Sequence, residues 1–146
     1  MTESRDEQFM RAAISEARKA YEKQEVPIGA VIVCNDMIIA RAHNLTETLR
    51  DPTAHAEMQA ITAAAEWLGG KYLTDCTIYV TVEPCAMCAG AIGWSQARRL
   101  VFGAADNKKG FSLISNRLLH QATDVEHGVL ANECGELMKK FFKTRR

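Results

Sequence analysis

The chain has 146 residues, of which 47% are hydrophobic and 25% are charged, and its 18 basic and 18 acidic side chains leave a formal net charge of zero. This length and balance predict a single globular domain over residues 1–146 and exclude a disordered or fibrous chain. A net charge of zero argues against strong non-specific attraction to nucleic acid.

Helical and β-rich patterns follow one another along the chain, which is typical of an α/β fold. The chain opens with apolar residues at three- and four-residue steps, and Asp51-Pro52-Thr53 is a later helix-start signal. The elements expected in chain order are a helix over 7–23, strands over 30–34 and 37–40, a helix from about 51 to 68, a strand over 76–81, a helix starting at Pro84, a strand over 99–104, a short strand near 123–126 and a helix over about 131–143.

The order of these elements predicts how the sheet is built. Asn35-Asp36 is a tight turn that joins the first two strands into an antiparallel hairpin. A helix separates strands 76–81 and 99–104, so that pair is expected to be parallel. We therefore expect a three-layer α/β/α sandwich with a central mixed five-stranded sheet. The helix before Gly69-Gly70 is expected to bury a stripe made of Met58, Ile61, Ala65 and Leu68.

The pattern that carries chemistry is His55-Ala56-Glu57, followed later by Pro84-Cys85-Ala86-Met87-Cys88. One imidazole and two thiolates suit zinc, and three protein ligands leave a fourth tetrahedral position for water. The pKa of water at such a site falls to about 7, so a nucleophile is available at neutral pH. Glu57 lies two residues after His55 and points in a different direction on a helix, so we expect it to move protons and not to bind the metal.

Each half of this pattern alone also fits a structural role. A Cys-x-x-Cys can be a redox pair or half of a structural zinc knuckle, and a lone His at a helix start is usually packed or solvated. A structural site needs a fourth ligand, but the other candidates show no paired spacing; they are Cys34, Cys76, Cys134, His43, His120 and His127. The two halves together favour a catalytic site with one zinc per chain, on which the amino ends of two helices converge.

Composition also bears on compartment and partners. Segment 1–7 is polar with no apolar stretch behind it, so neither a secretory signal nor a membrane partner is expected. Five cysteines, two of them assigned to a metal, fit a reducing compartment, and we expect a cytoplasmic protein.

Segment 139–146 is mostly basic and encloses Phe141 and Phe142, which suits either RNA contact or a basic helix end with a buried Phe pair. Segment Ala105–Leu119 is long for a loop, and such loops often cover a site.

With these residues the chain resembles the cytidine deaminase-like superfamily, and within it the bacterial tRNA-specific adenosine deaminases. The His-x-Glu and Pro-Cys-x-x-Cys motifs are the signature of zinc nucleobase deaminases. The matching blocks are 26–31, 51–57, 83–91 and 102–108. Ala86 stands where cytidine deaminases usually carry Gly. At the next position, Met87 resembles the pattern of the adenosine deaminases of this superfamily. The zinc motif is specific for the superfamily but does not by itself choose a substrate.

The resemblance implies a reaction, partners and a set of contacts. The reaction is hydrolytic deamination of adenosine to inosine at the wobble position of tRNA anticodons, by a homodimer with zinc on His55, Cys85 and Cys88 and with Glu57 as the proton shuttle. No DNA partner is expected. The implied substrate contacts are Asn44 for the flipped base, Val26 and Ile28 for an apolar wall, and Asp106, Lys108, Phe141 and Phe142 for the anticodon loop. Asn44 also fits a plain turn after a strand.

Two other hypotheses remain beside this one. Trp94 and the block Asp51–Glu57 are similar to bacterial guanine deaminases, which act on a free base, whereas the lysines of the 106–109 segment and the basic carboxy-terminal segment favour RNA. A zinc-stabilised RNA-binding module without catalysis is the remote alternative. Glu57 and the zero net charge argue against it, because such a module needs no acid beside an open metal position.

Overall fold

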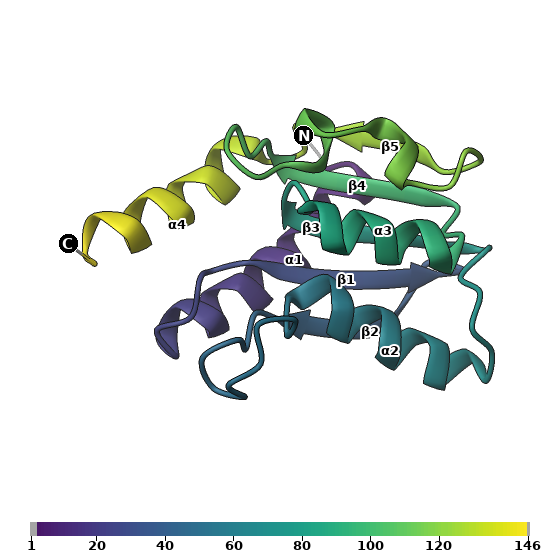
Figure 1. The fold of residues 1–146 in the computed structure, drawn as a ribbon, viewed down its shortest axis with the longest axis horizontal. Coiled ribbons are helices and arrows are strands. Elements are labelled where there is room, and N and C mark those ends of the chain that lie inside the picture. Colours follow the sequence, from purple (N-terminus) through teal and green to yellow (C-terminus); the bar gives the residue numbers. More distant parts are fainter. Residues whose placement is uncertain (1–2, 146) are drawn as a thin grey trace.

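The computed structural model describes residues 3–145 and contains a five-stranded sheet between helices (Figure 1). Met1, Thr2 and Arg146, which belong to the two terminal segments discussed above, lie outside the described residues. The elements are α1 (Arg5–Glu22), β1 (Gly29–Cys34), β2 (Met37–His43), α2 (Ala56–Leu68), β3 (Cys76–Val82), α3 (Ala86–Ser95), β4 (Arg99–Ala104), β5 (Asp124–His127) and α4 (Ala131–Lys143).

The strands follow the order β2-β1-β3-β4-β5 across the sheet. Strand β1 pairs antiparallel with both β2 and β3, while β3, β4 and β5 run parallel to one another. The mixed five-stranded sheet expected from the sequence is therefore confirmed, including the parallel pair on either side of α3.

Helices cover both faces of the sheet (Figure 1): α2 and α3 pack on one face, and α1 and α4 pack on the other. Neighbouring strand residues point to opposite faces. On β1, Ile32 packs in the cluster under α2 and α3, whereas Val31 and Val33 pack in the cluster under α1. The central strands are buried on both faces, which explains their almost unbroken apolar sequence.

Local signals explain where the first elements begin and turn. Helix α1 starts at Arg5, two residues before the expected start, because Ser4 and Glu7 form a capping box. Asn35 and Asp36 both have positive φ angles, 52° and 61°, as a tight hairpin turn requires. A Cβ atom at Gly29 would lie 2.1 Å from the Ala13 carbonyl oxygen, so only glycine lets α1 lie this close to β1.

The prediction for α2 is wrong in two respects. The helix begins at Ala56, with His55 as its N-cap, because the Asp51 carboxylate accepts hydrogen bonds from the Thr53 backbone and hydroxyl and holds a separate turn. The buried residues of the helix are Ala56, Glu57, Ala60 and Ala64. The stripe that was predicted to be buried lies beside the helix face that contacts the sheet. Met58, Ile61 and Ala65 are half-buried, and Leu68 is exposed. Small alanines let the helix approach the sheet, and the larger side chains lie at its flank.

The start of α3 also differs from the expectation. Cys85 is the N-cap in an extended conformation and the helix begins at Ala86, so Pro84 lies before the helix and not in its first turn. Segment 105–119 contains only two short 3-10 turns, Phe111–Leu113 and Asn116–Leu118, in agreement with the loop prediction. The short strand and the last helix agree with the expectation to within one residue. Among helices of residues 3–145, none is long and apolar enough to cross a membrane.

Candidate active site

Three predicted metal ligands meet between the amino ends of α2 and α3. His55 is the N-cap of α2, Cys85 is the N-cap of α3, and Cys88 lies in the first turn of α3. The Nδ1 atom of His55 lies 3.7 Å from Cys85 Sγ and 3.4 Å from Cys88 Sγ, and all three donor atoms lie within 4.8 Å of one another. Tetrahedral zinc, with bonds of about 2.0–2.3 Å, holds its donors about 3.5 Å apart. The spacing and the donor set fit one zinc ion per chain.

Protonation within this cluster also fits a cation site. A hydrogen bond from Cys88 lowers the pKa of the Cys85 thiol to about 4, and the His55 contact acts in the same direction. The hydrogen bond to Cys85 raises the pKa of Cys88, with burial adding to it, and the Cys85 contact raises the pKa of His55. The three donor atoms of His55, Cys85 and Cys88 therefore share protons with one another. A divalent cation there binds all of them at once.

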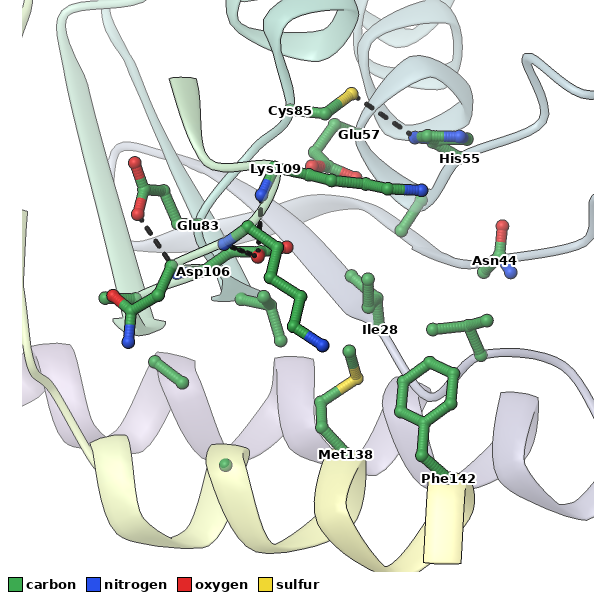
Figure 2. A pocket seen from close by; sticks show the side chains of 18 of the residues that line it. Ile28, Asn44, His55, Glu57, Glu83, Cys85, Asp106, Lys109, Met138 and Phe142 are labelled. Atoms are coloured by element: carbon green, nitrogen blue, oxygen red, sulfur yellow. Dashed lines mark hydrogen bonds between the residues drawn. The ribbon is translucent and has the colours of Figure 1, made fainter. Parts of the chain in front are cut away.

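Glu57 lies in the first turn of α2, beside the metal ligands (Figure 2). Its side chain is only 3% exposed, and burial raises the pKa of its carboxyl group to about 7. A group with a pKa near neutral pH can both accept and release a proton during turnover. The environment therefore suits the proton-transfer role expected from the sequence.

A cavity of about 780 Å³ extends from His55, Glu57 and Cys85 to the side of α4 (Figure 2). Asn44 stands at one side of it, directly after β2. The Asn44 side chain is nearly buried, its Nδ2 group donates to Thr46 Oγ1 at 3.4 Å, and its backbone N–H donates to the Ile28 carbonyl oxygen. The residues predicted as substrate contacts that line the cavity are Val26, Ile28, Asn44, Asp106, Lys108 and Phe142.

The two phenylalanines of α4 have different surroundings. Phe142 is 52% exposed and lines the cavity, together with Met138 one turn earlier (Figure 2). Phe141 is 6% exposed and does not line the cavity; its ring packs edge-on against Tyr21, with the centroids 6.1 Å apart. Successive residues of a helix point about 100° apart, and here Phe142 lines the cavity while Phe141 turns toward Tyr21 of α1. Phe141 is therefore a core residue in this structure.

Glu83 and Met138 line the cavity but were not among the substrate contacts predicted from the sequence, whereas Lys109, which also lines it, belongs to the 106–109 segment whose lysines were expected to favour RNA. Glu83 lies at the end of a buried strand, directly before Pro84-Cys85, and a charged residue at such a position was an available signal. Met138 is four residues before Phe142, a spacing that places both on one helix face. Trp94 lies on the outer side of α3, where 84% of it is exposed, and it does not line the cavity.

Comparisons with known proteins agree with this geometry. Residues 3–104 match the cytidine and deoxycytidylate deaminase zinc-binding region. The chain is 51% identical to the tRNA-specific adenosine deaminase of Bacillus subtilis (strain 168), over 98% of this chain and 92% of the relative. A structure from a study of A-to-I editing by tRNA:A34 deaminases at the wobble position of transfer RNA matches with a TM-score of 0.83 and 44% identity, over 89% of this chain and 98% of that chain.

A second kind of relative is also similar. The structure of guanine deaminase from Bacillus subtilis matches with a TM-score of 0.65 and 40% identity. That match covers 68% of this chain and 64% of the guanine deaminase chain. It leaves about a third of each chain unmatched, unlike the matches to tRNA-specific relatives.

Proposed function

This chain belongs to the family of zinc-binding cytidine and deoxycytidylate deaminases, and from that premise we propose that it deaminates adenosine to inosine at the wobble position of tRNA anticodons. One observation carries the proposal: a single cavity is lined both by His55, Cys85 and Glu57 and by exposed lysines. The chain is 51% identical to a tRNA-specific adenosine deaminase over nearly its full length, and this supports the choice of substrate. Such a substrate also implies a cytoplasmic enzyme.

The chemistry of the site follows from its side chains. Zinc held by His55, Cys85 and Cys88 supplies, when bound, a water molecule acidic enough to attack at neutral pH. A Glu57 carboxylate oxygen accepts a proton at this position and delivers it to the departing exocyclic nitrogen of adenine. The net reaction replaces the amino group at C6 by a carbonyl oxygen and releases ammonia. Burial raises the pKa of the Glu57 carboxyl group, which suits a residue that must both accept and release a proton.

Base recognition is assigned to the walls of the cavity. The Asn44 amide offers both a donor and an acceptor to a purine edge. Val26 and Ile28 form an apolar wall, which excludes water and accepts the face of a base. The cavity volume of about 780 Å³ exceeds what one purine base needs, so neighbouring nucleotides can enter as far as Phe142.

RNA binding is assigned to positive and aromatic side chains at the opening. Lys108, Lys109 and Lys139 line the cavity and are exposed, so they can meet phosphates although the whole chain has no net charge. Phe142 is available for stacking on a base. The target adenine of an anticodon loop is already unpaired, so flipping it into the cavity costs less than extracting a paired base.

The test is inosine formation in an anticodon stem-loop with adenine at the wobble position, with free guanine as the competing substrate. A matched stem-loop in which adenine occurs only outside the wobble position is the control for site selection. We expect inosine in the first RNA alone and about one zinc per chain by metal analysis. The similarity to guanine deaminase favours the alternative activity. Faster deamination of free guanine than of any stem-loop would replace our proposal by that one.

We also propose that the protein forms a homodimer through α2 and α3. The stripe of Met58, Ile61, Ala65 and Leu68 is only partly covered by this chain, although it has the spacing of one helix face. On α3, Met87 and Trp94 are 37% and 84% exposed. A second copy would cover these apolar side chains. We expect a dimer mass in light scattering, and a shift to monomer in Ile61→Asp; a monomeric wild-type protein would contradict the proposal.

A further inference from the structure

Glu83 is a buried carboxylate that the proposed chemistry does not use. It follows Val82 of β3, is 5% exposed, and is not among the clustered metal-ligating groups of the described chain. Its Oε1 atom accepts a hydrogen bond from the Asp106 backbone N–H at 3.1 Å. Its Oε2 atom accepts from the Ser112 backbone N–H at 3.0 Å and from the Ser112 hydroxyl at 2.7 Å. One side chain therefore holds both ends of the segment 106–112.

Hydrogen bonds inside this segment continue from the same anchor (Figure 2). The Asp106 carboxylate accepts from the backbone N–H groups of Lys108 and Lys109 at 3.0 and 2.9 Å, and the Asp106 carbonyl accepts from Gly110 N–H. The Lys109 side chain extends across the cavity toward His55 in Figure 2. The backbone position of both lysines is thus set through Asp106, which Glu83 holds in turn.

Gly110 shows how closely the segment passes Glu83. A Cβ atom at this position would lie 2.4 Å from the Glu83 carboxyl carbon and 2.5 Å from each of its oxygens. Three hydrogen bonds hold the carboxylate in place, so it could move away from such a Cβ atom only by giving up some of them. Alanine at 110 would therefore separate the segment from its anchor.

We propose that Glu83 is a positioning residue for RNA binding, which fixes segment 106–112 so that Lys108 and Lys109 stand at the cavity opening in the geometry that an RNA backbone requires. This inference rests on the proposed function. A preordered segment loses less conformational freedom when RNA binds, which favours affinity. Glu83 itself touches neither substrate nor metal in this role.

Two physical roles for Glu83 predict opposite changes in RNA affinity when the residue is replaced. If its charge mattered only through its field, Glu83→Gln would remove a negative charge near the lysines and RNA would bind more tightly. If it positions the segment, the variant places an amide NH₂ against donors at Asp106 or Ser112, the segment loosens, and RNA binds more weakly. The sign of the change in RNA affinity therefore separates the two roles.

The experiment measures Kd for the anticodon stem-loop over a series of salt concentrations, together with kcat and KM. For Glu83→Gln and Gly110→Ala we expect KM and Kd to rise about tenfold, with a smaller change in kcat. The slope of log Kd against log salt should fall by about 0.7 for each phosphate that the variant no longer neutralises. Lys108→Ala/Lys109→Ala should show the same change, and adding Glu83→Gln to this pair should weaken binding little further, because residues that act through one another are not additive.

Asp6→Asn is the matched control. The Asp6 carboxylate also accepts three hydrogen bonds, from the Tyr79 hydroxyl and from two Arg99 nitrogens, but it does not line the cavity. It undergoes the same change of charge and should leave KM and the salt slope as in the wild type. Ser112→Ala provides a milder variant if Glu83→Gln does not fold or hold zinc, since it removes one donor and leaves the carboxylate; KM should rise in the same direction.

Failure of the inference differs from failure of the proposed function. If the wild-type protein neither binds nor edits the stem-loop, the proposed function falls and this inference falls with it. If the wild type edits RNA while Ser112→Ala, Gly110→Ala and Glu83→Gln keep its KM and salt slope, only the role of Glu83 is overturned. Tighter RNA binding by Glu83→Gln, or full additivity with the lysine variants, would overturn it as well.

Discussion

The two ends of the cavity are built in different ways. At the metal end, His55 and Cys85 are N-caps of helices and Glu57 is almost fully buried, so main-chain geometry and the sheet fix each side chain. At the opening, Lys108, Lys109 and Phe142 are exposed and come from a loop and the last helix. Under the proposed function, the chemistry lies on rigid elements, and substrate affinity depends on more exposed ones. Substitutions at the two ends should therefore separate turnover from RNA affinity.

The largest effect is expected from removing a metal ligand. Cys85→Ala or His55→Ala should lose zinc and all measurable deamination, and should also lower the melting temperature, because the ion joins the starts of α2 and α3. Metal analysis and thermal unfolding measure both effects. Full zinc content with normal activity in either variant would show that the cluster is not the catalytic metal site.

Glu57→Ala should retain zinc while kcat falls by about 10²–10⁴-fold, the usual range for removal of a general acid–base group. Because this residue belongs to the metal end, Kd for the stem-loop and its salt dependence should stay close to the wild-type values. Single-turnover kinetics and RNA titration provide the comparison. Near-normal turnover would remove Glu57 from the role of proton shuttle.

The adjacent residues Phe141 and Phe142 of α4 provide a further test, because one is expected to affect stability and the other RNA affinity. Phe142→Ala should raise KM for RNA by about 5- to 150-fold, since stacking of one base on an aromatic ring contributes about 1–3 kcal/mol. Phe141→Ala should instead lower the free energy of unfolding by about 3–5 kcal/mol, because it leaves a hole beside Tyr21. Denaturant unfolding and steady-state kinetics on both variants test this division. Equal KM values for the two variants would contradict it.

Asp6→Asn should have the smallest effect on activity and a measurable effect on stability. Hydrogen bonds from Arg99 hold the pKa of the Asp6 carboxyl group well below its usual range. A depressed pKa in the folded state stabilises the protein above the unfolded pKa of about 3.9, and this stabilisation disappears as the pH falls further. We expect the variant to be less stable by about 1–3 kcal/mol at pH 7. In urea unfolding, its difference from the wild type should shrink below about pH 4; a constant difference would exclude the linkage.

Short-range sequence patterns were enough to predict most of the fold. The turn at Asn35-Asp36, the parallel pair around α3 and the limits of α4 all depend on neighbours in the chain. The metal ligands were predicted for the same reason: His55, Cys85 and Cys88 belong to two compact motifs with fixed spacing. The prediction of one domain over the whole chain stays a prediction.

The errors arose where distant parts of the chain decide the outcome. The stripe on α2 was predicted as buried from its periodicity alone, but the distance between helix and sheet favours the alanine face. Phe141 and Phe142 are identical in type, and only the position of Tyr21 on α1 makes the first of them a core residue. Glu83 accepts donors that lie 23 and 29 residues away, a separation that no local pattern reports.

The rim of the sheet formed by β5 bears on how copies of this protein can associate. Strand β5 is only four residues long and has all four residues exposed, with the carboxylates of Asp124 and Glu126 among them. A short, charged border strand discourages another chain from extending the sheet by main-chain pairing. Open-ended growth of the sheet from copy to copy is therefore disfavoured on this side of the molecule.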